Sequence, residues 1–393
     1  MALSSDSPKT PRPKRLPGRL SPNPRILKLH LSSYRELCPI QDLLPRRLPL
    51  IRLDANENAL GPSPLARKAI RKAAAESHRY PEIAGEGLRD FVASELGVRP
   101  EQIVFGNGST ELLELLFHVS LRNRHEEVVL PRHSFPLYEI LAQRFGCRAR
   151  VVPDRNFTAD LEMLREAITP RTRLVLLANP NNPTGTRVDN GALVAFAKGL
   201  PPHVLLALDE AYADFIDDPP PLREIIQQGI PVTVLRTFSK LHGLASLRIG
   251  YALASEEIAR ARQKASLPTN TSGIAQAAAM AALKDKRHQR KSKKTVRDGR
   301  LYLERLFRQL GLCWVPSCAN FVMIRPPRAE EVWKALVRRG VLVRSLHSWG
   351  LPGWLRVTIG TPEELHRFAG SLREALRKVH PLQPIPAGEP EGD

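Results

Sequence analysis

The chain has 393 residues, of which 42% are apolar, and a formal net charge of +19. This length allows a large core and one large domain with a smaller one. No apolar run approaches the roughly 20 residues of a membrane-spanning helix, and residues 1–27 lack the apolar core of a secretory signal. We therefore expect a cytoplasmic protein without a membrane partner.

The high positive charge raises the question of nucleic acid as a partner. The basic residues are spread along the whole chain and form no recognisable nucleic-acid-binding motif. We therefore expect anionic small ligands and no specific nucleic acid, while weak binding at low salt stays open. The four cysteines have no metal-ligand spacing, which predicts reduced thiols and no metal site: Cys38, Cys147, Cys313 and Cys318.

Residues 1–28 are rich in Pro, Ser and basic residues, with Asp6 as the one acid, and this composition predicts a disordered basic tail. An organellar transit peptide has a similar composition, but the prolines argue against an amphipathic helix. Next, the turn-rich segment 51–64 precedes predicted helices at 65–77 and 86–96, the second ended by Gly97.

A strand, a glycine turn and a helix follow in close succession. Ile103–Phe105 predicts a strand, Gly106–Thr110 a loop, and Glu111–Val119 an amphipathic helix. Free N–H groups at such a helix start can bind a phosphate. Ser109 and Thr110 could equally be helix caps, and the two roles are compatible.

Short apolar strands then alternate with helices, which predicts a mostly parallel α/β sheet. Four of these strands end in polar clusters. Because ligands of such sheets bind outside the carboxyl ends of the strands, we expect the four clusters to converge on one crevice. The clusters begin at Gly106, Asn179, Asp209 and Ser239.

One lysine, Lys240, follows a strand end and the hydroxyl-bearing turn Arg236–Ser239, and Arg248 comes eight residues later. A lysine can form a Schiff base with an aldehyde, while hydroxyls and a guanidinium hold a phosphate. Pyridoxal phosphate (PLP) is the obvious ligand with both groups. Alone, the pattern also fits one solvated lysine among many.

After residue 270 the pattern changes to that of a smaller α+β domain. Helices are predicted at 273–283, 297–310 and 363–379, and strands within 313–324, 340–345 and 354–359. The basic run 284–294 indicates a solvated helix face. We therefore divide the chain into a disordered tail, an N-terminal segment packing on the small domain, a large PLP-binding domain, a small domain and a second disordered tail, at residues 1–28, 29–58, 59–270, 271–380 and 381–393.

Eight short motifs lie between about Leu53 and Leu376: LDANENALGPSP, RYPE, GNGSTELLELL, ANPNNPTG, DEAY, LRTFSKLHGLASLRIGY, ANFV and LRVTIGTPEE. Together they resemble the fold-type-I PLP aminotransferases, and among these most the histidinol-phosphate aminotransferase family. The resemblance implies an α/β fold, with a large domain around a mostly parallel central sheet flanked by helices and a smaller α+β domain.

The resemblance also implies how each residue contacts the cofactor. Lys240 would form the Schiff base and move a proton, and Asp209 would keep the pyridine nitrogen protonated. Phe135 would stack on the ring, and Asn182 and Tyr212 would donate to its phenolic oxygen. The phosphate would be held by Gly108, Ser109, Thr110, Thr237, Ser239 and Arg248, and by Tyr80 from the partner subunit of a homodimer with shared active sites.

For the substrates, Arg356 and Arg344 would hold anionic groups, and Asn56 and Tyr34 would line the pocket. The implied reaction converts L-histidinol phosphate and 2-oxoglutarate to imidazole-acetol phosphate and L-glutamate in histidine biosynthesis. In such a ping-pong transamination, two arginines can serve both amines, because guanidinium binds carboxylate and phosphate alike.

Five positions depart from the family pattern: Thr110, Leu241, His242, Ser246 and Thr269. None removes a catalytic group, so PLP chemistry stays implied, but they border the pocket and bear on the substrate. An aromatic amino-acid aminotransferase or a threonine-phosphate decarboxylase on the same scaffold therefore stays open. A third interpretation is a non-catalytic PLP-sensing or nucleic-acid-binding protein.

Overall fold

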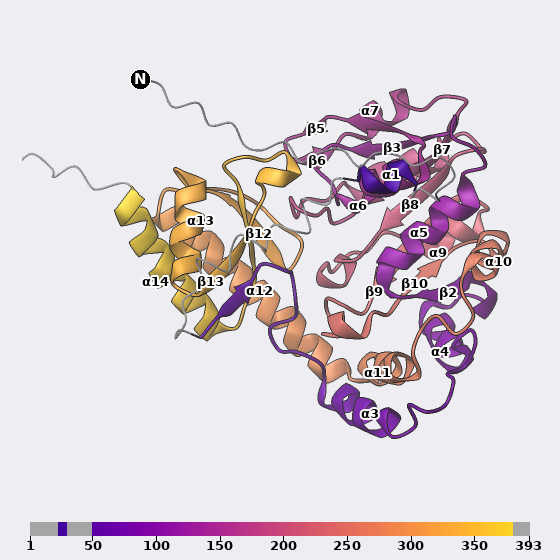
Figure 1. Ribbon diagram of the computed structural model, residues 1–393, viewed down its shortest axis with the longest axis horizontal. Coiled ribbons are helices and arrows are strands. Elements are labelled where there is room, and N and C mark those ends of the chain that lie inside the picture. Colours follow the sequence, from indigo (N-terminus) through magenta and orange to yellow (C-terminus); the bar gives the residue numbers. More distant parts are fainter. Residues whose placement is uncertain (1–22, 30–48, 380–393) are drawn as a thin grey trace, which may run out of the picture.

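The computed structural model describes residues 23–29 and 49–379 (Figure 1). The expected tails lie almost wholly outside these residues, and so does Tyr34. Within the expected first tail, α1 (Pro24–Leu27) is a single helical turn. The rest of the described chain forms a larger unit and a smaller unit, each built around its own sheet.

The sheet of the larger unit has seven strands in the order β2-β10-β9-β8-β7-β3-β4. Strands β9, β8, β7, β3 and β4 run parallel, whereas β10 is antiparallel to both of its neighbours, so the predicted mostly parallel sheet is confirmed. In chain order the strands are β2 (Ile103–Gly106), β3 (Glu127–Pro131), β4 (Arg148–Val152), β7 (Thr172–Ala178), β8 (Leu205–Asp209), β9 (Val232–Thr237) and β10 (Gly250–Leu253). A separate hairpin joins β5 (Asp154–Arg155) to β6 (Thr158–Ala159).

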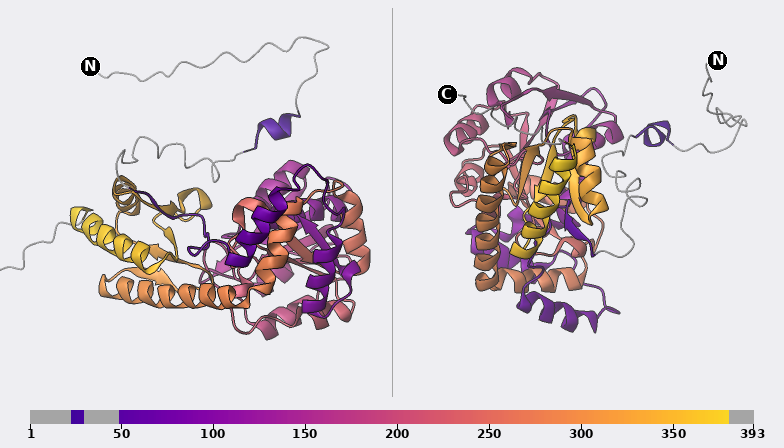
Figure 2. Two further views of the ribbon diagram at one scale, coloured as in Figure 1. Left: turned by 90° about the horizontal axis from the view of Figure 1, so that it is seen from below. Right: turned by 90° about the vertical axis from the view of Figure 1, so that its left-hand side faces the viewer.

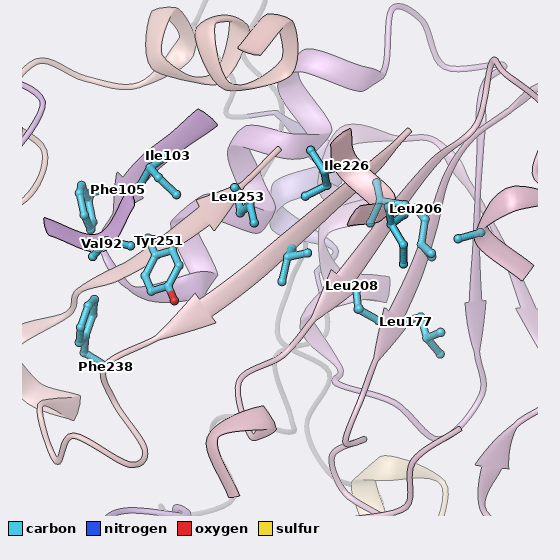
Figure 3. Close-up of a cluster of buried hydrophobic side chains, with 14 of the residues drawn as sticks. Val92, Ile103, Phe105, Leu177, Leu206, Leu208, Ile226, Phe238, Tyr251 and Leu253 are labelled. Atoms are coloured by element: carbon cyan, nitrogen blue, oxygen red, sulfur yellow. The ribbon is translucent and has the colours of Figure 1, made fainter. Parts of the chain in front are cut away.

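Both faces of this sheet are buried. Since successive side chains of a strand point to opposite sides, each strand contributes to two hydrophobic cores. In β8, Leu206 and Leu208 join one hydrophobic core, while Leu205 and Ala207 join the other. Figure 3 shows side chains of the first of these cores, among them Leu206 and Leu208. The covering helices are α3 (Pro64–Ala74), α4 (Glu86–Leu96), α7 (Leu161–Glu166), α8 (Asn190–Lys198), α9 (Leu222–Gln227) and α11 (Gly273–Lys284) on this face, and α5 (Gly108–Ser120), α6 (Leu137–Phe145) and α10 (Glu256–Ala265) on the other.

The start of α5 differs from the predicted loop at residues 106–110. The helix begins at Gly108, so Ser109 and Thr110 lie in its first turn and are not caps. The N-cap residue is Asn107, whose backbone and side-chain N–H groups both donate to the carboxylate of Glu111, at 2.5 and 3.1 Å. The helix thus begins three residues earlier than predicted, and Ser109 and Thr110 in its first turn line the crevice at the strand ends.

The smaller unit has a five-stranded sheet in the order β1-β13-β14-β12-β11. Its edge strand β1 (Ile51–Leu53) comes from the start of the described chain and pairs in parallel with β13. The other elements are α12 (Lys286–Gln309), β11 (Cys313–Val315), β12 (Phe321–Arg325), α13 (Ala329–Arg338), β13 (Val341–Ser345), β14 (Leu355–Thr358) and α14 (Pro362–Val379).

Helix α12 carries the chain from the larger to the smaller unit (Figures 1 and 2). The basic run at 284–294 and the predicted helix after it belong almost entirely to this one helix. Helix α11 precedes it and lies beyond the expected boundary at residue 270. Nevertheless, Ala275, Ala278 and Ala279 of α11 pack in a core of the larger sheet. Within residues 23–29 and 49–379, every helix is too short or too polar to span a bilayer.

The amino-terminal end of β3 holds a buried carboxylate among arginines. Glu127 is 1% exposed and accepts hydrogen bonds from Arg150 Nε at 2.6 Å and Thr169 Oγ1 at 2.8 Å. Arg171 lies 3.2 Å away and is more exposed. The hydrogen bond from Arg150 is the main reason that the pKa of Glu127 lies below its ordinary value.

We expect Glu127→Gln to lower the free energy of unfolding at pH 7 by about 2 kcal/mol, because it removes one partner of a buried ion pair. The folded-state pKa is below the unfolded value of about 4.3, so the stabilisation is complete above that pH and is lost as the pH falls through the folded value. Urea unfolding between pH 3 and 7 should therefore show the two proteins converging in acid.

The matched control is Glu114→Gln, since Glu114 pairs with Arg144 at 2.8 Å but both side chains are 37% exposed. Such a pair contributes under about 1 kcal/mol. An equal loss in both variants at pH 7 would contradict the role assigned to the buried cluster.

Candidate active site

A cavity of about 270 Å³ lies where the carboxyl ends of β7, β8 and β9 meet β13 and β14 of the smaller unit. The strand-end clusters predicted to converge therefore do so. Thirteen of the predicted site residues line this cavity: Asn56, Ser109, Thr110, Phe135, Asn182, Asp209, Tyr212, Thr237, Ser239, Lys240, Arg248, Arg344 and Arg356. Gly108 adjoins it as the first residue of α5.

Lys240 extends into this cavity from the turn that follows β9. Its Nζ donates to the carbonyl of Ala55 at 3.1 Å and lies 5.7 Å from the centre of the Tyr212 ring. Burial, and after it the positive charge of Arg356, lowers the pKa of the Lys240 amine to about 7. An amine with this pKa is partly neutral near pH 7, as a nucleophile and proton carrier must be.

Asp209, the last residue of β8, is the carboxylate of the cavity wall. Tyr138 of α6 donates to its Oδ2 at 2.9 Å, and the N–H of Ala211 donates to its Oδ1 at 3.1 Å. Burial raises the pKa of Asp209, while these two hydrogen bonds and the charge of Lys240 act in the opposite direction. Tyr138 also meets Phe135 edge to face at 5.9 Å, so one buried tyrosine supports two walls of the cavity.

Asn56 connects the beginning of the chain to the cavity. Its Nδ2 donates to the hydroxyl of Tyr212 at 2.9 Å, and its backbone N–H donates to Thr358 Oγ1 of β14 at 3.0 Å. Asn320 Nδ2 in turn donates to the carbonyl of Asn56 at 3.0 Å. Asn56 adopts a positive φ of 55°, a strained backbone state that these three contacts hold in place.

The first turn of α5 and Arg248 form a concave group of hydrogen-bond donors. Arg248 Nη2 lies 3.4 Å from the carbonyl of Asn107, and its Nη1 lies 3.5 Å from Ser239 Oγ. Gly108 has a φ of +72°, and a Cβ there would lie 2.6 Å from Arg248 Nη2. Glycine thus lets the guanidinium close onto the helix N-terminus, where N–H groups and positive charge suit a phosphate.

Two arginines form the opposite wall, on neighbouring strands of the smaller unit. Arg344 of β13 and Arg356 of β14 are paired in register. Arg356 is 4% exposed and donates to Asn182 Oδ1 and, at 2.8 Å, to the carbonyl of Asp54. In the part of the chain that the structure describes, the buried Nε atoms of both arginines have no hydrogen-bond partner. Two neighbouring arginines that both line the cavity suit an anionic ligand.

These residues fit PLP. The donor group at Gly108 and Arg248 suits its phosphate, Lys240 its aldehyde carbon, and Asp209 its ring nitrogen. Asn182 and Tyr212 line the same cavity and carry hydrogen-bond donors for the phenolic oxygen. A buried lysine, a buried carboxylate and a phosphate cradle at the carboxyl ends of parallel strands are the features of an α/β enzyme that binds PLP.

The chain belongs to the aminotransferase class I and II family, whose model matches residues 49–372. It is 41% identical over 354 residues to the histidinol-phosphate aminotransferase of Akkermansia muciniphila, covering 88% of this chain and 97% of that protein. The corresponding Moorella thermoacetica protein is 44% identical over 331 residues, covering 83% of this chain and 86% of that one. The predicted family is thereby confirmed.

Solved structures agree with this assignment. The histidinol-phosphate aminotransferase of Sinorhizobium meliloti in complex with PLP superposes with a TM-score of 0.83 at 29% identity, over 92% of this chain and 100% of that chain. A double mutant of Thermus thermophilus aspartate aminotransferase gives a TM-score of 0.77 at 25% identity, over 90% and 100% of the two chains. The protein is therefore a PLP-dependent aminotransferase with the predicted α/β fold.

Tyr80 is one predicted site residue that does not line this cavity. Its side chain is 92% exposed and borders a separate surface hollow with Asn107, Thr269 and Asn270. Its contact with a partner's cofactor stays a prediction. Sequence reasoning in turn missed Trp349 and the Ala55 carbonyl in the cavity, and the bond from Tyr138 to Asp209. The one available signal was the position of Trp349 between Arg344 and Arg356.

We expect the Lys240 amine of the cofactor-free protein to titrate near pH 7. Competitive acetylation followed by mass spectrometry between pH 5 and 11 should give this midpoint for Lys240, against about 10.4 for the same residue in urea. Arg356→Leu should move the midpoint upward, because among the neighbouring positive charges that of Arg356 lowers the pKa of Lys240 most. A midpoint above pH 9 in the folded wild-type protein would contradict the geometry described for the amine.

Proposed function

We propose that this aminotransferase transfers the amino group of L-histidinol phosphate to 2-oxoglutarate. The observation that carries the proposal is the arginine pair, Arg344 and Arg356, which lines the same cavity as Lys240. Such a pair suits two substrates that differ in their anion, a phosphate monoester and a dicarboxylate. The names of the curated relatives point to the same amino donor.

When bound, PLP supplies an electron-accepting ring that stabilises negative charge on the substrate α-carbon. The residues of the chain then perform four tasks. The α5 N-terminus and Arg248 would anchor the phosphate, and Phe135 would fix the plane of the ring. Asp209 would keep a proton at the ring nitrogen, and Asn182 and Tyr212 would hold the phenolic oxygen.

Lys240 would move the proton. With a pKa near 7, its amine is partly neutral and can accept a proton from the substrate α-carbon, and it would then deliver that proton to the cofactor carbon that carries the aldehyde. Arg356 would bind the anionic end of the substrate in the same cavity as this amine. Burial lowers the pKa of Arg356 to about 10, so the guanidinium still carries its charge at neutral pH.

A homodimer with shared active sites is part of this proposal. Tyr80, Ile83 and Leu267 are large apolar side chains with 92, 65 and 76% of their surface exposed. Exposed apolar groups of this size suit a protein interface. The segments around Tyr80 and Leu267 border the same hollow, next to the α5 N-terminus at Asn107. A cytoplasmic location also belongs to the proposal, consistent with free thiols at Cys147, Cys313 and Cys318.

With 2-oxoglutarate as acceptor, we expect kcat/KM for histidinol phosphate to exceed that for phenylalanine by about a hundredfold or more. Such a ratio corresponds to about 2.7 kcal/mol of differential transition-state binding, which a phosphate held by two arginines can supply. The measurement is a coupled assay for glutamate, with Lys240→Ala as the blank.

Two variants serve as controls for this ratio. Arg344→Leu and Arg356→Leu should each lower kcat/KM for histidinol phosphate and for 2-oxoglutarate, since the phosphate of the first and the carboxylate of the second would use the same arginine pair. A preference for phenylalanine would mean an aromatic amino-acid aminotransferase on this scaffold. Turnover of neither amine would overturn the proposed reaction.

Shared active sites predict complementation between two inactive chains. Lys240→Ala and Tyr80→Ala should each be nearly inactive when the PLP concentration is low. After co-refolding, half of the dimers would be mixed, each with one intact site, which gives about a quarter of wild-type activity. A mixture no more active than Tyr80→Ala alone, or a monomer by sedimentation, would contradict the shared dimer.

A further inference from the structure

Trp349 lines the active-site cavity but belongs to none of the groups assigned above. It ends a short 3₁₀ turn, His347–Trp349, between the two strands that carry Arg344 and Arg356. The centre of its ring lies 5.4 Å from the guanidinium carbon of Arg356. At this distance a cation is attracted to the negative face of an indole.

A second ring contacts the same guanidinium. The centre of the Phe321 ring is 5.2 Å from Arg356, and Phe321 is completely buried without lining the cavity. Phe321 therefore supports Arg356 from within the smaller unit, and Trp349 is the aromatic contact that also faces the cavity. Together with the hydrogen bonds to Asn182 and Asp54, these rings restrict the guanidinium to one orientation and leave its Nε unused.

The indole of Trp349 is itself held by packing. Its Nε1 is buried and has no hydrogen-bond partner among residues 23–29 and 49–379, so no side-chain hydrogen bond fixes the ring there. It packs instead in a cluster with Met323, Leu346 and Trp354. Phe157, from the hairpin of the larger unit, joins this cluster and meets Trp354 edge to face at 5.0 Å.

We propose that Trp349 is a positioning residue that holds the Arg356 guanidinium in its anion-binding orientation and thereby sets the affinity for the anionic group of both substrates. The inference rests on the proposed role of Arg356 in substrate binding. Trp349 has no part in proton transfer, because neither Lys240 nor Asp209 contacts it through any recorded hydrogen bond or ring contact within the described residues. Its loss should therefore change KM and leave kcat almost unchanged.

The test compares three variants of the PLP-loaded enzyme. Trp349→Leu removes the aromatic face, and we expect KM for histidinol phosphate and for 2-oxoglutarate to rise about tenfold each, with kcat within about twofold of wild type. Trp349→Phe keeps a weaker aromatic face and should restore both KM values to within about threefold. Trp354→Leu is the matched control: it loosens the same cluster without contacting Arg356, and should lower Tm while leaving KM unchanged.

A second readout does not depend on turnover. Inorganic phosphate and succinate, titrated into the PLP-loaded enzyme by calorimetry, should bind about tenfold more weakly to Trp349→Leu than to wild type. This arm stays informative if histidinol phosphate is not the substrate, so failure of the proposed reaction and failure of this inference are distinguishable. Unchanged anion affinity in Trp349→Leu, an equal effect of Trp354→Leu, or a fall in kcat with constant KM would each overturn the inference.

Discussion

The active site depends on an excess of positive charge that the protein itself does not neutralise. Among the described residues that line the cavity, Lys240, Arg248, Arg344 and Arg356 are basic, and Asp209 is the one carboxylate. Burying such a set costs free energy unless anions enter. Ligands would offset this cost: a phosphorylated cofactor at one wall and, in the proposed function, an anionic substrate at the other. Affinity for both is thus built into the charge distribution.

Backbone geometry separates these charges into two groups. Strands β7, β8 and β9 deliver Asn182, Asp209 and Lys240 to one edge of the larger sheet, since their carboxyl ends coincide. The antiparallel pair β13 and β14 presents Arg344 beside Arg356 from the smaller unit. The residues expected to bind the cofactor and the arginine pair expected to bind the substrate therefore line one cavity at the boundary between the units. Burial is the main reason that the pKa of Lys240 is low, and the charge of Arg356, which would also attract the substrate, lowers it further.

The sequence predicts the contribution of the larger sheet well, because strand ends and their polar residues are encoded locally. Convergence of Asn182, Asp209 and Lys240 was expected because the carboxyl ends of neighbouring parallel strands lie at one edge of the sheet. The tertiary contacts were not predictable: Tyr138 reaches Asp209 across 71 positions of the chain. The boundary at residue 270 was drawn from a change in composition, but half of the 12 residues of α11 are alanine, and this helix packs in a core of the larger sheet. Helix α10 was not assigned, since its sequence offers few apolar residues and its burial depends on α5.

The edge strand β1 has a consequence for the order of folding. It places Asp54 and Asn56 against Arg356 and Thr358, contacts that span 302 positions of the chain. During synthesis, the larger sheet can form around Lys240 while the ribosome is still adding the smaller unit. The anion-binding wall cannot close until β14 has emerged, when the first and last strands of the smaller sheet meet. A nascent chain can therefore form the phosphate-binding group of α5 and Arg248 before Arg356 is in place. A chain that ends before β14 lacks Arg356 and with it half of the arginine pair.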